Sequence, residues 1–317
     1  MTVRRRAVFL GSGAFAVPVI DALAVAPEVT LVGVVTAPPR RAGRGHRQTE
    51  SLVSVEAGRL GLRTLAPERL RTPESVAAVV ALVPELLVLA DYGQLVPPTL
   101  LDVPRHGALN LHPSLLPRHR GAAPIPAAIL AGDIETGVTL MRMDAGLDSG
   151  PIVAQRRIPL NGRETAPQLE AALAVIAAEL LATSLRGWLA GELPAQAQPA
   201  EGATLTRPLR REDGRLDPHL PGAELERRVR ALQPWPGTFA ETDAGRLIVW
   251  AAQPVPGPAA EPGAIVADGD SLALGVADGT LRLLKVQLAG GRRMSGAELR
   301  RGHPDLAGSR IHVSALG

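Results

Sequence analysis

The chain has 317 residues, 46% of them hydrophobic, and 34 basic against 31 acidic side chains give a formal net charge of +3 at pH 7. This length allows two domains with separate cores, and the small net charge does not by itself indicate a nucleic-acid partner. The absence of cysteine excludes disulfides, thiolate catalysis and cysteine-ligated metals, and the spacing of the histidines predicts no metal site.

The first 190 residues alternate between short apolar segments and helical patterns. We expect strands over 7–10, 29–35, 85–90 and 138–141 and around Leu109, and helices over 14–25, 51–60 and 165–189. The run after Glu85 is apolar throughout, as in a parallel strand that is buried on both faces. This alternation predicts an α/β domain with a doubly wound, mostly parallel, Rossmann-like sheet.

The turn after the first strand carries a Gly-x-Gly-x-x-Ala sequence that begins at Gly11 and Gly13. A dinucleotide-binding fingerprint also requires an acidic residue at the end of the second strand, and Val34-Val35-Thr36 supplies none. Arg40 and Arg41 could hold a 2′-phosphate instead, so an NADP-dependent oxidoreductase remains an alternative. A tight turn with close packing between strand and helix is the favoured interpretation.

A glycine-hinged basic loop covers 36–48 and carries Arg40, Arg41, Arg44 and Arg47. Arginine binds phosphate in a bidentate way, so this segment is either an ordinary solvated loop or a loop that grips a phosphate. Because it follows the second strand, it lies beside the carboxyl end of the sheet, where open α/β folds bind their ligands.

A polar pair interrupts the apolar strand around Leu109. Asn110 and His112 are two residues apart, so their side chains point to the same face of a strand. The turn over 113–117 ends the strand and places both residues at its carboxyl end. Asp148 stands in a glycine-rich loop that can curl towards this strand end. An amide, an imidazole and a carboxylate together suit the polarisation of a carbonyl and the movement of a proton.

The pattern changes after about residue 190. Residues 192–208 are polar and contain proline, which is typical of an interdomain linker. Beyond them we expect a helix over 224–232 and short strands over 246–250, 264–266, 271–276 and 280–287. The sequence therefore predicts a catalytic domain over 1–191, a linker over 192–208 and a small OB-like β-barrel over 209–317.

Two expectations concern the surroundings of the protein. No uninterrupted apolar run reaches the roughly 18 residues that cross a bilayer, which favours a cytoplasmic protein without membrane contact. No long exposed apolar stripe argues for an oligomer, so we expect a monomer. Arginines cluster again at 207–215, 227–230 and 292–301, and such clusters can bind a polyanion.

Several segments resemble the folate-dependent formyltransferases and, within them, the family that acts on methionyl-tRNA. The most specific segments are the Asn110-x-His112-x-Ser-Leu-Leu-Pro element and the loop from Asp144 to Gly150. Further matches are 8–12, 40–45, 92–93, 120–125, 135–139 and the Pro-Trp-Pro sequence at 234–236. The resemblance covers essentially the whole chain, with departures from the family pattern at Ala37, Pro39, Pro208 and Pro218.

This resemblance implies a reaction. It is the transfer of the formyl group of 10-formyltetrahydrofolate, a cosubstrate, to the α-amine of initiator methionyl-tRNA. Asn110 and a protonated His112 would donate hydrogen bonds to the developing oxyanion. Asp148 would orient His112, raise its pKa and relay the proton of the amine. The reaction implies no metal.

The resemblance also implies where the substrates bind. The turn Ser114, Leu115, Leu116 and Pro117 would line the folate pocket, with 87–93 and 140–148 as its other walls. The tRNA would contact arginines of the basic loop and of the second domain, namely Arg40, Arg41, Arg44, Arg47, Arg207, Arg292 and Arg293. Formyltransferases that act on a sugar nucleotide or on glycinamide ribonucleotide, and a tRNA-binding chaperone without catalysis, remain alternatives.

Overall fold

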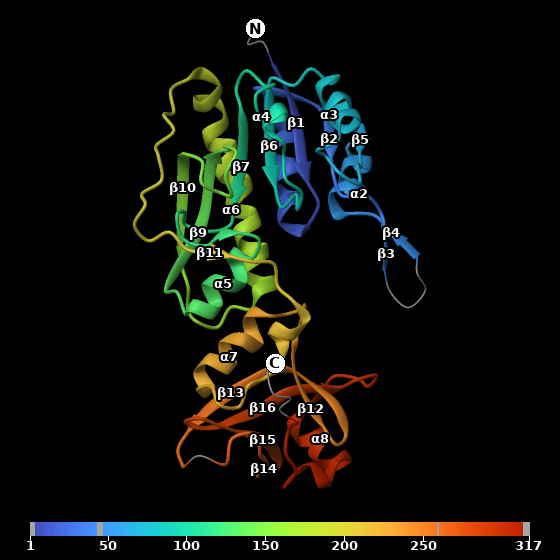
Figure 1. Ribbon diagram of the computed structural model, residues 1–317, viewed down its shortest axis with the longest axis vertical. Helices are drawn as coiled ribbons and strands as arrows, with labels where there is room; N and C mark the ends of the chain where they lie inside the picture. The colour runs from blue at the N-terminus through green and yellow to red at the C-terminus, as the bar shows by residue number, and fades with distance from the viewer. Residues whose placement is uncertain (1–3, 43–46, 259, 313–317) are drawn as a thin grey trace. The chain divides into compact units, whose positions relative to one another are not determined.

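The computed structural model describes residues 4–42, 47–258 and 260–312, and the chain divides into two compact units (Figure 1). The first unit comprises Met1–Pro124, Glu135–Pro159 and Gln168–Arg207. The second comprises Ile125–Ile134, Leu160–Pro167 and Pro208–Gly317. Most of the expected linker, 192–207, therefore groups with the first unit, and two short segments from the predicted catalytic domain group with the second.

A seven-stranded sheet in the order β10-β9-β7-β6-β1-β2-β5 forms the first unit. Five strands are parallel, and these are β1 (Arg5–Gly11), β2 (Val29–Val35), β5 (Thr64–Leu65), β6 (Leu86–Ala90) and β7 (Ala108–His112). Two strands at one edge, β9 (Glu135–Arg142) and β10 (Ile152–Pro159), run antiparallel to their neighbours. The prediction of a doubly wound, mostly parallel sheet is confirmed, and β6 is buried along its whole length as its apolar run requires.

The sheet of the first unit is flanked by helices and short ordered segments. The helices are α1 (Val17–Val25), α2 (Leu52–Arg59), α3 (Pro73–Val80), α4 (Pro98–Leu101) and α6 (Ala166–Ala190), whereas all of α5 (Pro124–Ala131) but its first residue groups with the second unit. Two short strand pairs complete it, β3 (Arg40–Ala42) with β4 (Arg47–Thr49) and β8 (Arg120–Gly121) with β11 (Leu205–Thr206). Helix α2 begins where the Ser51 hydroxyl accepts a hydrogen bond from the amide of Ser54 at 2.9 Å.

Gly11 and Gly13, the glycines of the fingerprint-like sequence, lie where β1 passes into the 3-10 helix at Ala14–Ala16, and close packing there requires glycine. A Cβ on Gly11 would lie 2.7 Å from the carbonyl oxygen of Ala90, and a Cβ on Gly13 would lie 1.8 Å from Oδ2 of Asp91. An acidic residue that binds ribose would stand at the end of β2, which is Val35 here. The next residue, Thr36, is buried, and its hydroxyl contacts the Ser51 hydroxyl at 2.6 Å. Close packing therefore accounts for this turn, as the favoured interpretation expects.

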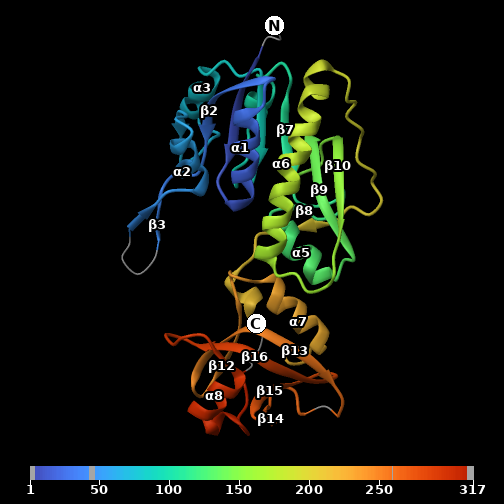
Figure 2. The ribbon, with the colours of Figure 1, turned by 180° about the vertical axis from the view of Figure 1, so that it is seen from behind.

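Helix α6 is the one helix among the described residues that is long and apolar enough to span a membrane. It escapes a search for uninterrupted apolar runs because a few charged residues are spread along it. Its side chains at Leu173, Leu181 and Leu185 are buried in the protein, and the helix lies across the sheet in Figure 2. The helix thus serves as a core helix in this structure.

The second unit is built on an antiparallel sheet in the order β12-β13-β16-β15-β14. Its strands are β12 (Thr238–Thr242), β13 (Gly245–Pro256), β14 (Ile265–Asp268), β15 (Ser271–Val276), β16 (Gly279–Leu288) and β17 (Met294–Ser295), with helices α7 (Gly222–Ala231) and α8 (Gly296–Gly302). The amide of Ile265 donates to Ser309 and the amide of His312 donates to Glu241, both at 2.8 Å. The segment 309–312 therefore joins the two edge strands, as in a small barrel.

Candidate active site

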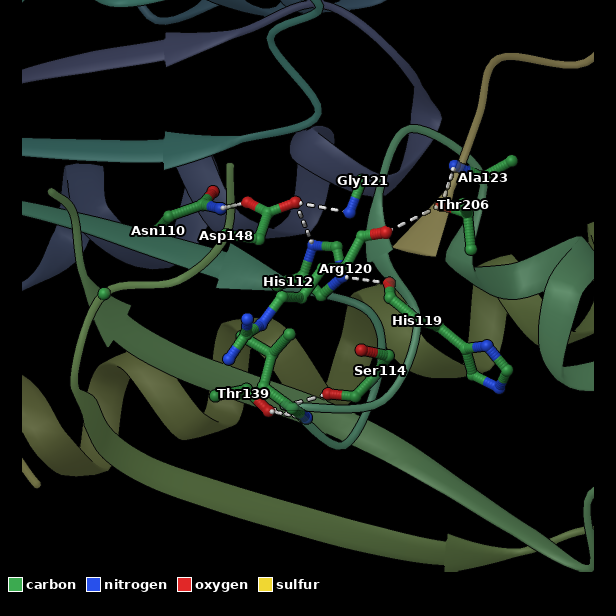
Figure 3. Close-up of polar contacts among 12 residues, drawn as sticks. Asn110, His112, Ser114, His119, Arg120, Gly121, Ala123, Thr139, Asp148 and Thr206 are labelled. Carbon is green, nitrogen blue, oxygen red and sulfur yellow. Dashed lines mark hydrogen bonds and ion pairs between the residues drawn. The ribbon is translucent and has the colours of Figure 1, made fainter. Parts of the chain in front are cut away.

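Three predicted residues meet at the carboxyl end of β7 (Figure 3). Asn110 and His112 both project from this strand, and Asp148 approaches from the loop between β9 and β10. The Asn110 amide donates to Oδ1 of Asp148 at 3.4 Å, and Nδ1 of His112 lies 3.6 Å from Oδ2 of the same carboxylate. The structure therefore brings the predicted amide, imidazole and carboxylate together.

The imidazole of His112 is held from both sides. Its Nε2 lies 2.9 Å from the backbone carbonyl oxygen of His119. A carbonyl oxygen only accepts, so Nε2 carries the hydrogen and donates it. In the neutral ring Nδ1 then has a free lone pair, and this is the atom that faces Asp148.

Two opposing effects act on the protonation of His112. Its side chain is buried, and burial lowers the pKa of His112 below its ordinary value. The charge of Asp148 and the hydrogen bond to His119 act in the opposite direction but are the smaller effects. Burial therefore argues against the protonated His112 that the resemblance implies, because the sequence shows the neighbouring carboxylate but not how completely the ring loses water.

Strained backbone lies on both sides of the same ring. Asp148 has a φ of +49° and His119 has a φ of +58°, a region that residues with a Cβ rarely adopt. Each of them presents to His112 the group that contacts it, a carboxylate in one case and a carbonyl in the other. Such conformations persist where the surroundings fix them, and they concentrate at functional sites.

The carboxylate of Asp148 has a further partner that the sequence did not identify. The backbone amide of Gly121 donates to Oδ2 of Asp148 at 2.8 Å. Gly121 has a φ of +105°, and a Cβ at this position would lie 2.3 Å from the carbonyl oxygen of Thr206. Only glycine therefore lets this loop approach β11 closely enough to deliver the amide. The sequence shows the Arg120-Gly121 pair, but only the folded loop shows that the amide of Gly121 contacts Asp148.

Hydrogen bonds to the Thr139 hydroxyl fix the turn over 114–117, which is predicted to bind folate. The hydroxyl of Thr139 donates to the carbonyl oxygen of Ser114 at 2.7 Å and accepts from the amides of Leu116 and Gln155 at 3.1 and 2.9 Å. Ser114 and Leu116 are buried, whereas Leu115 and Pro117 are half-buried. Thr139 and Gln155 thus hold the shape of the turn, and sequence reasoning missed both because their role depends on β9 and β10 lying beside it.

A cavity of about 350 Å³ opens at the other end of the loop that carries Asp148. Its walls are residues of α4, the start of β7 and the loop after β9, namely Pro98, Leu101, Asp102, Gly107, Ala108, Arg142, Met143, Asp144, Ala145 and Pro151. Residues 142–145 belong to a predicted folate wall, whereas the turn 114–117 is not part of this lining. Mixed apolar walls with a few polar groups are typical of small-molecule sites.

The arginines predicted to contact tRNA lie in several places. Arg40, Arg41 and Arg47 belong to the β3–β4 pair, and Arg44 falls outside the described residues. Arg207 is exposed at the end of the first unit. In the second unit the guanidinium of Arg293 stacks 3.6 Å from the centre of the Trp250 ring, and Arg292 pairs with Glu298 at 2.9 Å. Within the described residues no group of three or more His, Asp or Glu side chains could hold a metal ion.

Comparison with known proteins agrees with this fold. Residues 4–185 match the family described as "Formyl transferase", and residues 208–304 match "Formyl transferase, C-terminal domain". Among solved structures, HypX from Aquifex aeolicus in complex with tetrahydrofolic acid has a TM-score of 0.62 at 16% identity, with 94% of this chain and 47% of that chain covered. An N-formyltransferase from Helicobacter canadensis has a TM-score of 0.62 at 14% identity, with 89% of this chain and 99% of that chain covered. These two likenesses concern the fold, and the chain spans about half the length of HypX.

Closer relatives share most of the sequence length. A methionyl-tRNA formyltransferase of Paramagnetospirillum magneticum is 43% identical over 93% of this chain and 96% of its own length. The enzyme of the same name from Halorhodospira halophila is 44% identical, with 92% and 94% covered, and that of Granulibacter bethesdensis is 43% identical, with 98% of both chains covered. Both domains and nearly the full length match, and the chain belongs to the methionyl-tRNA formyltransferase family.

Proposed function

We propose that this protein transfers the formyl group of 10-formyltetrahydrofolate to the α-amine of initiator methionyl-tRNA, as a cytoplasmic monomer. The observation that carries the proposal is the meeting of Asn110, His112 and Asp148 at the end of β7. Chains that are 41–44% identical over nearly their full length bear the name of this activity, which supports the choice of acceptor. The folate supplies the formyl carbon when it is bound.

The residues divide the chemical work. Asn110 donates from its amide to the oxygen of the formyl group, where negative charge develops as the amine attacks the carbon. Neutral His112 accepts a proton of the attacking amine at Nδ1, the atom with the free lone pair. A new carbon–nitrogen bond forms to the amine, the bond to the folate nitrogen breaks, and the proton passes on to that nitrogen.

Asp148 stabilises His112 after the ring has accepted the proton. A proton on Nδ1 makes His112 an imidazolium that faces the carboxylate of Asp148 across 3.6 Å. The negative charge of Asp148 stabilises the imidazolium, whereas burial of the ring disfavours it. In this proposal the ring begins neutral and is charged only during the reaction, whereas the resemblance implies a protonated His112 that donates to the oxyanion.

The cavity beside the same loop supports a place for the folate ring system. Leu101, Ala108 and Met143 supply apolar walls, and Asp102 and Asp144 supply polar atoms, which suits a flat heteroaromatic ring with donors and acceptors at its edge. The loop that lines this cavity also carries Asp148. A folate ring bound in the cavity would therefore contact the same loop that supplies the carboxylate of the site. The assignment of Ser114, Leu115, Leu116 and Pro117 to the folate site stays a prediction.

A substrate comparison tests the proposed function. The protein is incubated with 10-formyltetrahydrofolate and, separately, with methionyl-initiator-tRNA, an amino-sugar nucleotide or glycinamide ribonucleotide. We expect formylation of methionyl-tRNA alone, with loss of tRNA binding as salt rises because the arginines replace counterions on phosphate. Formylation of the sugar or the ribonucleotide, or no formylation at all, would overturn the proposal.

A further inference from the structure

We propose that Gln198 is a positioning residue for the catalytic carboxylate of Asp148, acting from the segment that the sequence presents as a linker. The inference rests on the proposed function of the Asn110–His112–Asp148 site. It assigns a role in catalysis to residues 198–206, which lie outside the loops that carry the three reacting side chains.

The amide of Gln198 uses its full hydrogen-bonding capacity within this site. Its Nε2 donates to the carbonyl oxygens of Asp148 and Gly150 at 2.8 and 2.7 Å. Its Oε1 accepts from Nε and Nη2 of Arg120 at 3.0 and 2.8 Å. One side chain therefore joins the two loops that meet at the carboxylate, the loop of Asp148 and the loop of Arg120 and Gly121.

These contacts support a backbone conformation that residues with a Cβ rarely adopt. Asp148 holds a φ of +49°, and such a conformation relaxes unless its surroundings fix it. Gln198 fixes the carbonyl group of Asp148, and Gly121 fixes its carboxylate through a backbone amide. Without Gln198 both carbonyl oxygens lose their donor and Arg120 loses its acceptor. The carboxylate would then move away from Nδ1 of His112.

The rest of the same segment supports the other side of the imidazole. The hydroxyl of Thr204 accepts from the amide of His119 at 2.8 Å, and the carbonyl oxygen of Thr204 accepts from the amide of Arg120 at 2.9 Å. The hydroxyl of Thr206 donates to the carbonyl oxygen of Arg120 at 3.0 Å (Figure 3). His119 supplies the carbonyl that holds Nε2 of His112, so the segment restrains both partners of the ring.

The chain contains a matched control two residues away. Gln196 is an exposed glutamine of the same segment, and its described contacts are backbone hydrogen bonds with Ile152 at 2.7 and 2.8 Å. Gln196→Ala removes a glutamine side chain from the segment without touching the site. Gln198→Glu adds a second probe, because a carboxylate still accepts from Arg120 but cannot donate to the carbonyl oxygens of Asp148 and Gly150.

The first measurement is steady-state formyl transfer by the full chain. We expect Gln198→Ala and Gln198→Glu to lower kcat about 10- to 100-fold, the effect of a displaced catalytic group. KM for methionyl-tRNA should stay within about twofold, because the side-chain hydrogen bonds of Gln198 to the described residues all go to the two loops. Gln196→Ala should equal the parent. Equal kcat for all variants, or equal losses for Gln196→Ala and Gln198→Ala, would overturn the inference.

The second measurement is independent of activity. The imidazole of His112 is titrated by NMR in each folded variant, with His112→Gln to identify its signal. Asp148 and His119 are the titratable groups that act on this ring, and the carboxylate raises its pKa. Gln198→Ala and Gln198→Glu should therefore lower the pKa of His112 further, and Gln196→Ala should not. An unchanged titration in Gln198→Ala would contradict the inference, whereas a parent protein inactive towards methionyl-tRNA would contradict only the proposed function.

Discussion

Nδ1 of His112 lies 3.6 Å from Oδ2 of Asp148, although burial lowers the pKa of this imidazole. The attraction between Asp148 and His112 is therefore strongest when the ring takes up a proton, which in the proposed mechanism happens during the reaction. Four further groups fix the pair: the carbonyl of His119, the amide of Gly121, and the side chains of Asn110 and Gln198.

The pH dependence of kcat follows from the neutral state of His112. The base must be unprotonated, so kcat should rise with pH along a limb that lies below the ordinary histidine value of 6.5 and reach a plateau by pH 7. Asp148→Asn removes a charge that raises the pKa of His112, so the limb should move to still lower pH as kcat falls. Initial rates between pH 5 and 9 check this. A kcat that declines from pH 6 to pH 8 would instead show that a protonated His112 is the active form.

Gly121→Ala should reduce both activity and stability. The new Cβ would lie 2.3 Å from the carbonyl oxygen of Thr206 on a backbone with φ of +105°, so the loop must move and take its amide away from Asp148. We expect kcat to fall about 10- to 100-fold and the free energy of unfolding to fall by roughly 1–3 kcal/mol. Gly162→Ala is the control, because φ there is +77° but nothing lies within 4 Å of the new Cβ. A Gly121→Ala enzyme with the kcat of Gly162→Ala would argue against the amide contact.

Thr139→Val should loosen the turn over 114–117. Valine keeps the shape of threonine but leaves the carbonyl oxygen of Ser114 and the amide of Leu116 without their hydroxyl partner. Loss of such buried hydrogen bonds costs roughly 1–3 kcal/mol. Urea unfolding measures this, with Thr183→Val on the exposed face of α6 as the control. Equal midpoints for the two variants would mean that Thr139 does not organise the turn.

Much of the first unit follows from its sequence pattern. The bounds of β2 and β15 coincide with the predicted segments 29–35 and 271–276, and the i, i+2 spacing of Asn110 and His112 places both at one site. Strand β10 was missed because it lies at the edge of the sheet with a half-exposed, mixed sequence that lacks a clear period. Residues 196–206 were missed for a similar reason. Polar segments with proline look like linkers, and only the fold shows that the amide of Gln198 reaches the loop of Asp148.

Asp91 predicts a pH dependence of stability that is separate from catalysis. Asp91 as a whole residue is exposed, but neighbouring atoms take water away from its carboxyl, and this loss of water together with the charge of Glu170 raises the pKa of Asp91 from 3.8 to about 6. Because the folded state holds this proton more tightly than the unfolded state, the stability contribution of Asp91 is lost as the pH rises from about 4 to 6. Asp91→Asn should therefore have a higher Tm than the parent at pH 8, and the difference should shrink at pH 4. Exposed Asp305→Asn serves as the control, and an Asp91→Asn variant with a lower Tm at pH 8 would contradict the prediction.

The most direct test of the proposed chemistry is the single-turnover rate of formyl transfer by His112→Gln, with tRNA affinity measured in parallel. Glutamine can still donate to the carbonyl of His119 but offers no base to the amine. If neutral His112 accepts the proton of the attacking amine, the rate falls about 10²–10⁴-fold, while Kd for methionyl-tRNA stays unchanged. A variant that transfers the formyl group at the parent rate would contradict a catalytic role for His112.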